Sequence, residues 1–178
     1  MAMASSWPDW QNPDIVLYHG TLAKDAGNIQ QNGVDLSHCR PDKDFGRGFY
    51  TTTLLAQAIA FADTKSANNT GSSAAVIKFT VNRIALAKLK SLAFIRGTVD
   101  PASPANNAID YWSFVAHCRR GDRSHPVTDE DYDVVYGPVA RTWFGPARSR
   151  TEPGWDQISF HTKAAASILN QSQYEVLT

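Results

Sequence analysis

Three short segments of the sequence contain the residue types that could bind and transform a ligand. The first, Tyr18-His19-Gly20-Thr21, ends an apolar run, and the glycine after the histidine lets a ligand approach the backbone closely. At this position the imidazole is expected to donate a hydrogen bond to a sugar hydroxyl. The alternative for a lone histidine is a ring that caps an element or is satisfied within the core.

The second segment is Phe45-Gly46-Arg47-Gly48-Phe49-Tyr50. Its two glycines indicate a turn that places the ring of Tyr50 on a strand, where the ring can stack on a flat heterocycle. In the third, residues 156–162, strand alternation puts Gln157, Ser159 and His161 on one face. The structural alternatives are a tyrosine in the core and a polar strand face turned to solvent. Taken singly, none of the three segments specifies a function.

The elements that would position these segments follow from hydrophobic periodicity and turn residues. Short β-rich runs predict strands over 15–19, 49–52, 75–81, 133–136 and 158–161. Helical spacing predicts helices over 22–32, 54–66, 109–119 and 163–173, and the N-caps expected for the first and last are Thr21 and Thr162. Loops are expected over 37–48, 100–106 and 145–155. This layout predicts a single α+β domain over 14–178, preceded by an N-terminal tail over 1–13.

Charge, cysteine content and hydropathy make several classes of partner and ligand unexpected for this chain. The chain has 178 residues, with 17 Lys and Arg against 17 Asp and Glu, so a nucleic-acid partner, which needs a basic surplus, is not expected. Two cysteines and the lack of zinc-like spacing of His and Cys predict no metal site. No apolar run is long enough to span a membrane, so no membrane partner is expected. The N-terminus lacks a Sec-type signal, which favours the cytoplasm, or delivery into a host cell by a specialised secretion system.

Taken in order, the segments resemble a known family. His-Gly-Thr after a strand, followed by Phe-Gly-Arg-Gly-Phe-Tyr, resembles the paired motifs of the diphtheria-toxin and PARP-like ADP-ribosyltransferases. More closely, the chain resembles a small, mostly microbial branch of that superfamily, long catalogued as a domain of unknown function. The branch motifs occur here at residues 18–20, 44–50, 112–115, 133–140 and 157–162. The resemblance covers nearly the whole chain after residue 14.

The resemblance implies an ADP-ribosyltransferase fold, in which two small, mostly antiparallel sheets flanked by helices form an NAD cleft. It implies a mono-ADP-ribosyltransferase, which transfers ADP-ribose from NAD, its co-substrate, to a protein side chain and releases nicotinamide. Some members of the branch act as effectors on threonine of host ubiquitin, so ubiquitin is the acceptor protein that the resemblance suggests. Two alternatives remain open: an NAD glycohydrolase, with water as the acceptor, and a degenerate module that only binds a ligand or partner.

The resemblance also implies roles for individual residues. His19 would hold the adenosine ribose, the backbone of Gly20 would hold the nicotinamide carboxamide, and Tyr50 would pack near the nicotinamide ring. Phe61, eleven residues after Tyr50, stands where PARP-like enzymes place the aromatic that stacks on this ring, although its helical position suits the core equally well. Smaller roles with the ribose or the pyrophosphate are implied for two further polar residues, Thr21 and Arg47.

One position departs from the family pattern. The third residue of the family's catalytic set is often a Glu at the start of a late strand. The first two members match His19 and Tyr50 here, and the third matches Gln157. An amide can hold a ribose hydroxyl through its oxygen or its NH₂ group, but it cannot act as a general base. The departure favours transfer of a single ADP-ribose over polymer formation. It leaves the base for the acceptor open among Asp156, Glu152 and His161.

Overall fold

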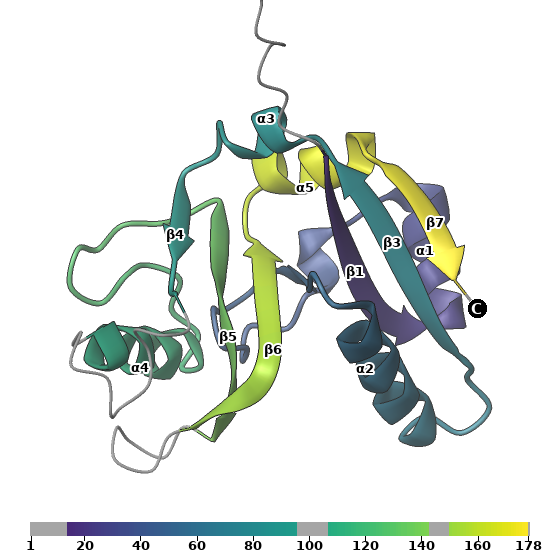
Figure 1. Ribbon diagram of the computed structural model, residues 1–178, viewed down its shortest axis with the longest axis horizontal. Coiled ribbons are helices and arrows are strands. Elements are labelled where there is room, and N and C mark those ends of the chain that lie inside the picture. Colours follow the sequence, from purple (N-terminus) through teal and green to yellow (C-terminus); the bar gives the residue numbers. More distant parts are fainter. Residues whose placement is uncertain (1–13, 96–106, 143–149, 178) are drawn as a thin grey trace, which may run out of the picture.

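Two small sheets make up the β-structure of the protein, which the computed structural model describes over residues 14–95, 107–142 and 150–177 (Figure 1). The first sheet is antiparallel, has the order β1-β3-β7 and consists of β1 (Ile15–Leu22), β3 (Ala74–Val81) and β7 (Gln173–Leu177). The second sheet has the order β2-β6-β5-β4 and consists of β2 (Phe49–Thr51), β6 (Arg150–Phe160), β5 (Val134–Thr142) and β4 (Ser91–Ala93). Within the second sheet, β4 runs parallel to β5 and the other pairs are antiparallel.

Helices flank both sheets. They are α1 (Ala23–Asn32), α2 (Leu55–Ala67), α3 (Arg83–Leu86), α4 (Asn107–Cys118) and α5 (Lys163–Gln171), with a 3₁₀ turn over Leu36–His38. In Figure 1, α2 lies against β1, and α4 lies on the side of the second sheet that is away from the first sheet. The described chain is therefore α+β, with two mostly antiparallel sheets flanked by helices, as the sequence predicted.

Apolar side chains form two main cores, and the glycine-rich segment before β2 is anchored in both. The first core includes Leu17 and Phe79 of the first sheet and takes in Phe49 at the start of β2. The second packs α4 against β5 and takes in Phe45. Because both ends of the segment from Phe45 to Phe49 are buried, its turn is held in a fixed position between the two sheets.

The two sheets meet at one point beside the candidate site residues. Tyr18 of β1 and Thr52, just after β2, exchange backbone hydrogen bonds of 2.8 and 2.9 Å. Asp156 of β6 reinforces this junction, because its carboxylate accepts from the hydroxyl of Thr52 and, at 3.0 Å, from the amide of Thr53. The side chain of Gln57 in α2 bonds both backbone groups of Asp156, at 2.6 and 3.0 Å. The start of α2 is therefore fixed to β6 as well as to β1.

Helix α2 crosses β1 at Gly20. A Cβ atom on Gly20 would lie 2.0 Å from the carbonyl oxygen of Ala58 and 3.1 Å from the amide nitrogen of Ala62. Both are backbone atoms of α2, which cannot move aside without moving the helix. Glycine at position 20 thus permits a close approach that brings the buried face of α2, with Ala58 and Ala62, against the His-Gly segment.

Several element boundaries differ from the sequence prediction. β1 extends through Thr21, which pairs with Ala75, and the N-cap position of α1 falls on Leu22, so the prediction of Thr21 as a cap is wrong. The strand predicted over 133–136 continues to Thr142, because β5 keeps pairing with β6. The prediction of a loop over 145–155 is wrong for residues 150–155, which form the first half of β6.

The C-terminal region shows a confirmed cap and a missed strand. Thr162 accepts a hydrogen bond from the amide of Ala165 at 3.2 Å, as expected of the N-cap of α5. The helix ends at Gln171, and the next residues form β7, which was not predicted; nor were the short α3 and β4. The predictions for 1–13, 100–106 and 145–149 lie outside the described residues. Among the described residues, no helix combines the length and the hydropathy that a membrane span needs.

Candidate functional site

One large cavity, of about 830 Å³, opens where β1, β2 and α2 come together. Six residues that the sequence singled out line it, namely His19, Gly20, Thr21, Tyr50, Phe61 and Gln157. Arg47 does not line it, because its guanidinium donates to the carbonyl oxygens of Ser37 at 3.3 Å and Cys39 at 2.8 Å. The volume is in the range of cavities that enclose a small organic ligand.

The imidazole of His19 presents a hydrogen-bond acceptor to this cavity. Its Nδ1 lies 2.6 Å from the carbonyl oxygen of Tyr50 and must carry the hydrogen, because a carbonyl only accepts. Burial and the nearby charge of Lys65 lower the pKa of His19 to about 4, so the ring is neutral at pH 7. The expectation that this imidazole donates to a ligand is therefore wrong. The donor is already used within the protein, and Nε2 remains as an acceptor.

The side chain of Gln157 is fixed in the same way, by two groups that only accept. Its Nε2 lies 2.8 Å from a carboxylate oxygen of Asp44 and 3.0 Å from the carbonyl oxygen of Pro138. Both amide hydrogens are thus used, which settles the orientation of the amide. No described residue donates to Oε1, so Gln157, like His19, offers an acceptor atom to a ligand.

The polar face of β6 is buried, so the interpretation of residues 157, 159 and 161 as a solvent-facing row is wrong. Gln157, Ser159 and His161 are each less than a tenth exposed, because the segment that carries Asp44 and Arg47 covers this face. Ser159 and His161 hydrogen-bond each other at 2.6 Å, and Nδ1 of His161 donates to the carbonyl oxygen of Arg47 at 2.8 Å. These two residues therefore hold the glycine-rich turn rather than a ligand.

Tyr50 shapes the cavity without offering its hydroxyl. The hydroxyl donates to the carbonyl oxygen of Gly46 at 2.8 Å and accepts from the amide of Phe45 at 3.0 Å. These bonds close the turn onto the ring, and Gly46 supports the turn with a φ of +78°. Burial raises the pKa of Tyr50 well above its usual value, so the phenol is not an acid or base near pH 7.

Two lysines give the cavity a positive charge that sequence reasoning missed. Lys65 and Lys43 both line it, and no described carboxylate lies within ion-pair distance of either. Nζ of Lys65 lies 3.4 Å from both the carbonyl oxygen of Gly20 and the hydroxyl of Thr21. Burial, with repulsion from Lys43, lowers the pKa of Lys65. The signal in the sequence was the spacing of Phe61 and Lys65, which are one helical turn apart and share a face of α2.

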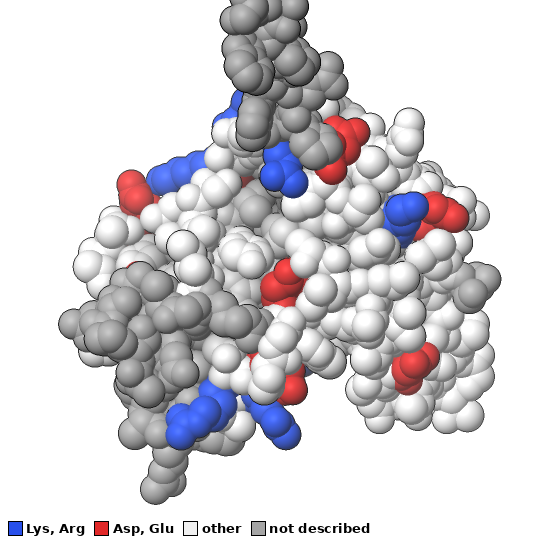
Figure 2. All heavy atoms as spheres, in the orientation of Figure 1, with Lys and Arg blue, Asp and Glu red and all other residues white. Residues whose placement is uncertain are grey.

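Phe61 belongs to the cavity rather than to the core. Its side chain is 48% exposed, and the ammonium of Lys65 lies 5.4 Å from the centre of its ring. Leu54, Leu55 and Ile59 of the same region are each more than a third exposed. Figure 2 shows this part of the surface, at the lower right where α2 lies in Figure 1, as mainly free of charged side chains. Exposed apolar side chains therefore occur in this region outside the cavity as well as in it.

None of the three candidate bases lines the cavity. Asp156 is engaged by Thr52 and Thr53, as described above, and His161 is bonded to Ser159. Glu152 forms an ion pair of 3.5 Å with Arg141. The carboxylates that do line the cavity are Asp25, Asp35 and Asp44. The residues described in the structure contain no group of three side chains that could hold a metal ion.

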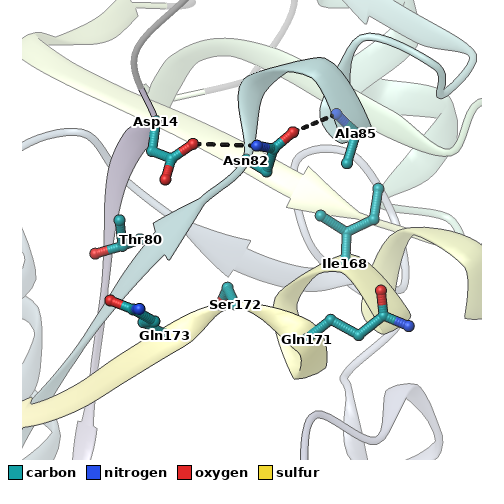
Figure 3. A pocket seen from close by; sticks show the side chains of 8 residues that line it. All are labelled: Asp14, Thr80, Asn82, Ala85, Ile168, Gln171, Ser172 and Gln173. Atoms are coloured by element: carbon teal, nitrogen blue, oxygen red, sulfur yellow. Dashed lines mark hydrogen bonds between the residues drawn. The ribbon is translucent and has the colours of Figure 1, made fainter.

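A second, smaller cavity, of about 260 Å³, lies at the other end of the first sheet (Figure 3). Its lining includes Asp14, Asn82 and Gln171 but none of the residues that the sequence singled out. Nδ2 of Asn82 donates to the carboxylate of Asp14 at 3.3 Å, and its Oδ1 caps α3 by accepting from the amide of Ala85 at 2.9 Å. This cavity therefore has polar walls whose central amide is used for local structure.

Comparison with known proteins places the chain in a family without assigning it a function. No curated protein matches it. A family model described as a protein of unknown function, DUF3990, matches residues 15–143. The match includes β1, the glycine-rich turn, α2 and β5, which form most of the large cavity, and it ends before β6 and Gln157. The chain belongs to the DUF3990 family.

Proposed function

We propose that this protein is a mono-ADP-ribosyltransferase that uses NAD as co-substrate and modifies a protein side chain. The observation that supports this most strongly is the large cavity itself. It collects six residues to which the resemblance assigns roles with NAD, although these residues come from β1, β2, α2 and β6. In this proposal, the two sheets with their flanking helices form an ADP-ribosyltransferase fold.

The atoms that the cavity offers match the parts of NAD. Nε2 of His19 and Oε1 of Gln157 are neutral acceptors, which suit the hydroxyl groups of two riboses. Lys43 and Lys65 supply positive charge for the diphosphate. The backbone of Gly20 and the exposed ring of Phe61 lie together and suit a flat ring that bears a carboxamide.

The chemistry divides between the co-substrate and the protein. NAD supplies an ADP-ribosyl group when the bond between nicotinamide and ribose breaks and neutral nicotinamide leaves with the bonding electrons. The acceptor oxygen then forms the new bond to the same ribose carbon, and its proton passes to solvent water. The protein holds the hydroxyls, keeps the ribose beside the amide oxygen of Gln157 and shields the ring; such a positively charged sugar centre is stabilised by adjacent oxygen dipoles.

Exposed apolar side chains in this region favour a protein acceptor over water. Phe61 is exposed at the cavity, and Leu54, Leu55 and Ile59, in or just before α2, are exposed outside it. Exposed apolar patches are typical of places where another protein docks. The branch that the chain resembles suggests threonine of ubiquitin as this acceptor.

The test is nicotinamide release from NAD, measured by chromatography, with and without ubiquitin or a cell lysate. Release that depends on added protein, with a mass increase of one ADP-ribosyl group on that protein, would support the transferase. The Phe61→Ala variant is expected to lower release about tenfold or more. Ile84→Ala is the matched control, because Ile84 is also an exposed apolar residue on a helix but lies away from the cavity.

Two results would replace the proposal with one of its alternatives. Equal release with and without added protein, and no label on any protein, would identify a glycohydrolase. Binding of NAD without release of nicotinamide under any condition would identify a binding module.

A further inference from the structure

Asp44 lies beside Gln157 in the wall of the large cavity and was not singled out from the sequence. We propose that Asp44 is a positioning residue: its carboxylate holds the amide of Gln157 so that the amide oxygen, and not the NH₂ group, faces the ligand. This inference rests on the proposed function, because it concerns the same cavity and the same co-substrate.

The contacts of Asp44 are complete. The side chain is 5% exposed. Its Oδ1 accepts from the guanidinium of Arg119, through Nε at 2.9 Å and through Nη2. Its Oδ2 accepts from the amide of Ala140 at 2.8 Å and from Nε2 of Gln157 at 2.8 Å. Four donors match the four lone-pair sites of an ionised carboxylate, so Asp44 has no capacity left to bind a ligand itself.

The same contacts explain why a glutamine suits position 157. A carboxylate there would stand at hydrogen-bonding distance from the carboxylate of Asp44, with no hydrogen between them, and the two charges would repel. The carbonyl oxygen of Pro138, 3.0 Å from Nε2, would also lose one of its two donors and keep only the hydroxyl of Tyr111, at 2.8 Å. The negative charge that related enzymes often place at this position thus lies one residue further from the ligand, on Asp44.

The orientation matters because the two ends of an amide have opposite polarity. With its NH₂ group held by Asp44 and Pro138, Gln157 presents the negative end of its dipole. This end stabilises the positive charge that develops on the ribose as nicotinamide departs, an effect felt in the transition state more than in the ground state. Replacing Asp44 by asparagine would put an amide beside the amide of Gln157, so that only the carbonyl oxygen of Pro138 would still require a donor from Gln157, which weakens the constraint on its orientation.

The test compares four proteins: wild type, Asp44→Asn, Gln157→Glu, and the double variant. We expect Asp44→Asn to lower kcat for nicotinamide release about tenfold while KM for NAD changes less than threefold. In the wild-type background, Gln157→Glu is expected to lower kcat, because the two carboxylates repel each other. In the Asp44→Asn background, the same change is expected to raise kcat about threefold or more, because an asparagine amide at position 44 can donate to a carboxylate at position 157. Gln30→Glu, on the exposed face of α1, is the matched control for the same chemical change.

The reversal of sign between the two backgrounds is the decisive result. A merely structural Asp44 would give the same effect of Gln157→Glu in both backgrounds, and that outcome would overturn the inference. If Asp44→Asn does not fold, the pH profile of Gln157→Glu decides instead. Its activity relative to wild type is expected to rise several-fold as pH falls from 8 to 5.5, because a shared proton removes the repulsion, and a flat ratio would overturn the inference. Failure of the proposed function would differ, because wild type itself would then either release no nicotinamide or release it equally with and without an added protein, whatever residue stands at position 44.

Discussion

The large and the small cavity described above differ less in their kinds of residue than in whether the polar atoms of those residues are already paired. In the small cavity, the amide of Asn82 is used at both ends, by Asp14 and by the first turn of α3. In the large cavity, the donors of His19 and Gln157 are paired within the protein. Their acceptors are left for a ligand.

The comparison teaches that fixed, incomplete pairing is the mark of a binding site in this molecule. A side chain with one end held and the other end open presents a known atom at a known place. A side chain with both ends held, such as Asn82, has no atom left to bind a ligand itself. Changes in the large cavity should therefore alter ligand binding, whereas changes in the small cavity should alter stability alone.

The largest effect is expected from removing the close approach that builds the wall of the large cavity. Gly20→Ala places a Cβ 2.0 Å from a backbone oxygen of α2, which should displace the helix and cost about 3 kcal/mol or more of unfolding free energy. Gly27→Ala, in α1, meets nothing within 4 Å and should stabilise the protein by about 0.5–1 kcal/mol. Urea unfolding of both variants measures this. Equal stability of the two would contradict the packing described for α2 and β1.

The next largest effect is a pH dependence of stability, which the buried imidazole of His19 causes. The pKa of His19 falls from about 6.5 in the unfolded chain to about 4 in the folded protein, so the unfolded state binds the extra proton between these values. Stability is therefore fully present above pH 6.5 and is lost as pH falls toward 4, by on the order of 3 kcal/mol. His161, whose pKa is also lowered by burial, acts in the same direction.

The measurement is the unfolding free energy between pH 7.5 and 4.5 for wild type and His19→Gln. The variant should show the shallower loss, because it removes one of the two imidazoles whose pKa is lowered by burial. Parallel curves would show that His19 is not the group that senses pH.

A smaller effect should separate the two cavities by function. Lys65→Met removes a cation that no described carboxylate pairs, so NAD binding should weaken about tenfold, the value of one charge-assisted hydrogen bond. Stability should not fall, because burial of this charge is unfavourable in the absence of ligand, as the lowered pKa of Lys65 indicates. Calorimetric titration with NAD measures this, and Lys24→Met, on the exposed side of α1, is the control. Unchanged affinity in Lys65→Met would exclude the lysine from the site.

The smallest effect is expected in the small cavity. Asn82→Ala removes the cap of α3 and the bond to Asp14, at a cost of about 1 kcal/mol in stability, with no change in nicotinamide release. Thermal unfolding and the release assay together measure this. A loss of activity without a loss of stability would place a function in the small cavity, and it would contradict the expectation that changes there alter stability alone.

The elements that sequence predicted well are those whose signals are local. The α+β class and the cap at Thr162 follow from residues adjacent in the chain. The first half of β6 was missed because Pro153 and Gly154 indicate a loop, and only pairing across the sheet makes the segment a strand. β4 and β7 are too short and too exposed for their patterns to be seen.

The same limit applies to the site. Sequence indicated His19, Tyr50 and Gln157, but it could not show which atoms of these side chains remain open. That property depends on partners such as Asp44, which is 113 positions from Gln157 in the chain. Burial of the polar face of β6 was also unforeseeable from alternation alone, because alternation specifies which residues share a face and not what covers it.

Adjacent residues of β6 perform unlike tasks, and this constrains how the gene can change. Asp156 holds the junction of Thr52 and Thr53, whereas its neighbour Gln157 faces the cavity. A one-codon insertion or deletion that let the strand slide by a single step would exchange the two faces and destroy both arrangements at once. Length variation among related genes is therefore expected outside residues 156–160, and a shift inside this stretch is expected to mark a copy that has lost its activity.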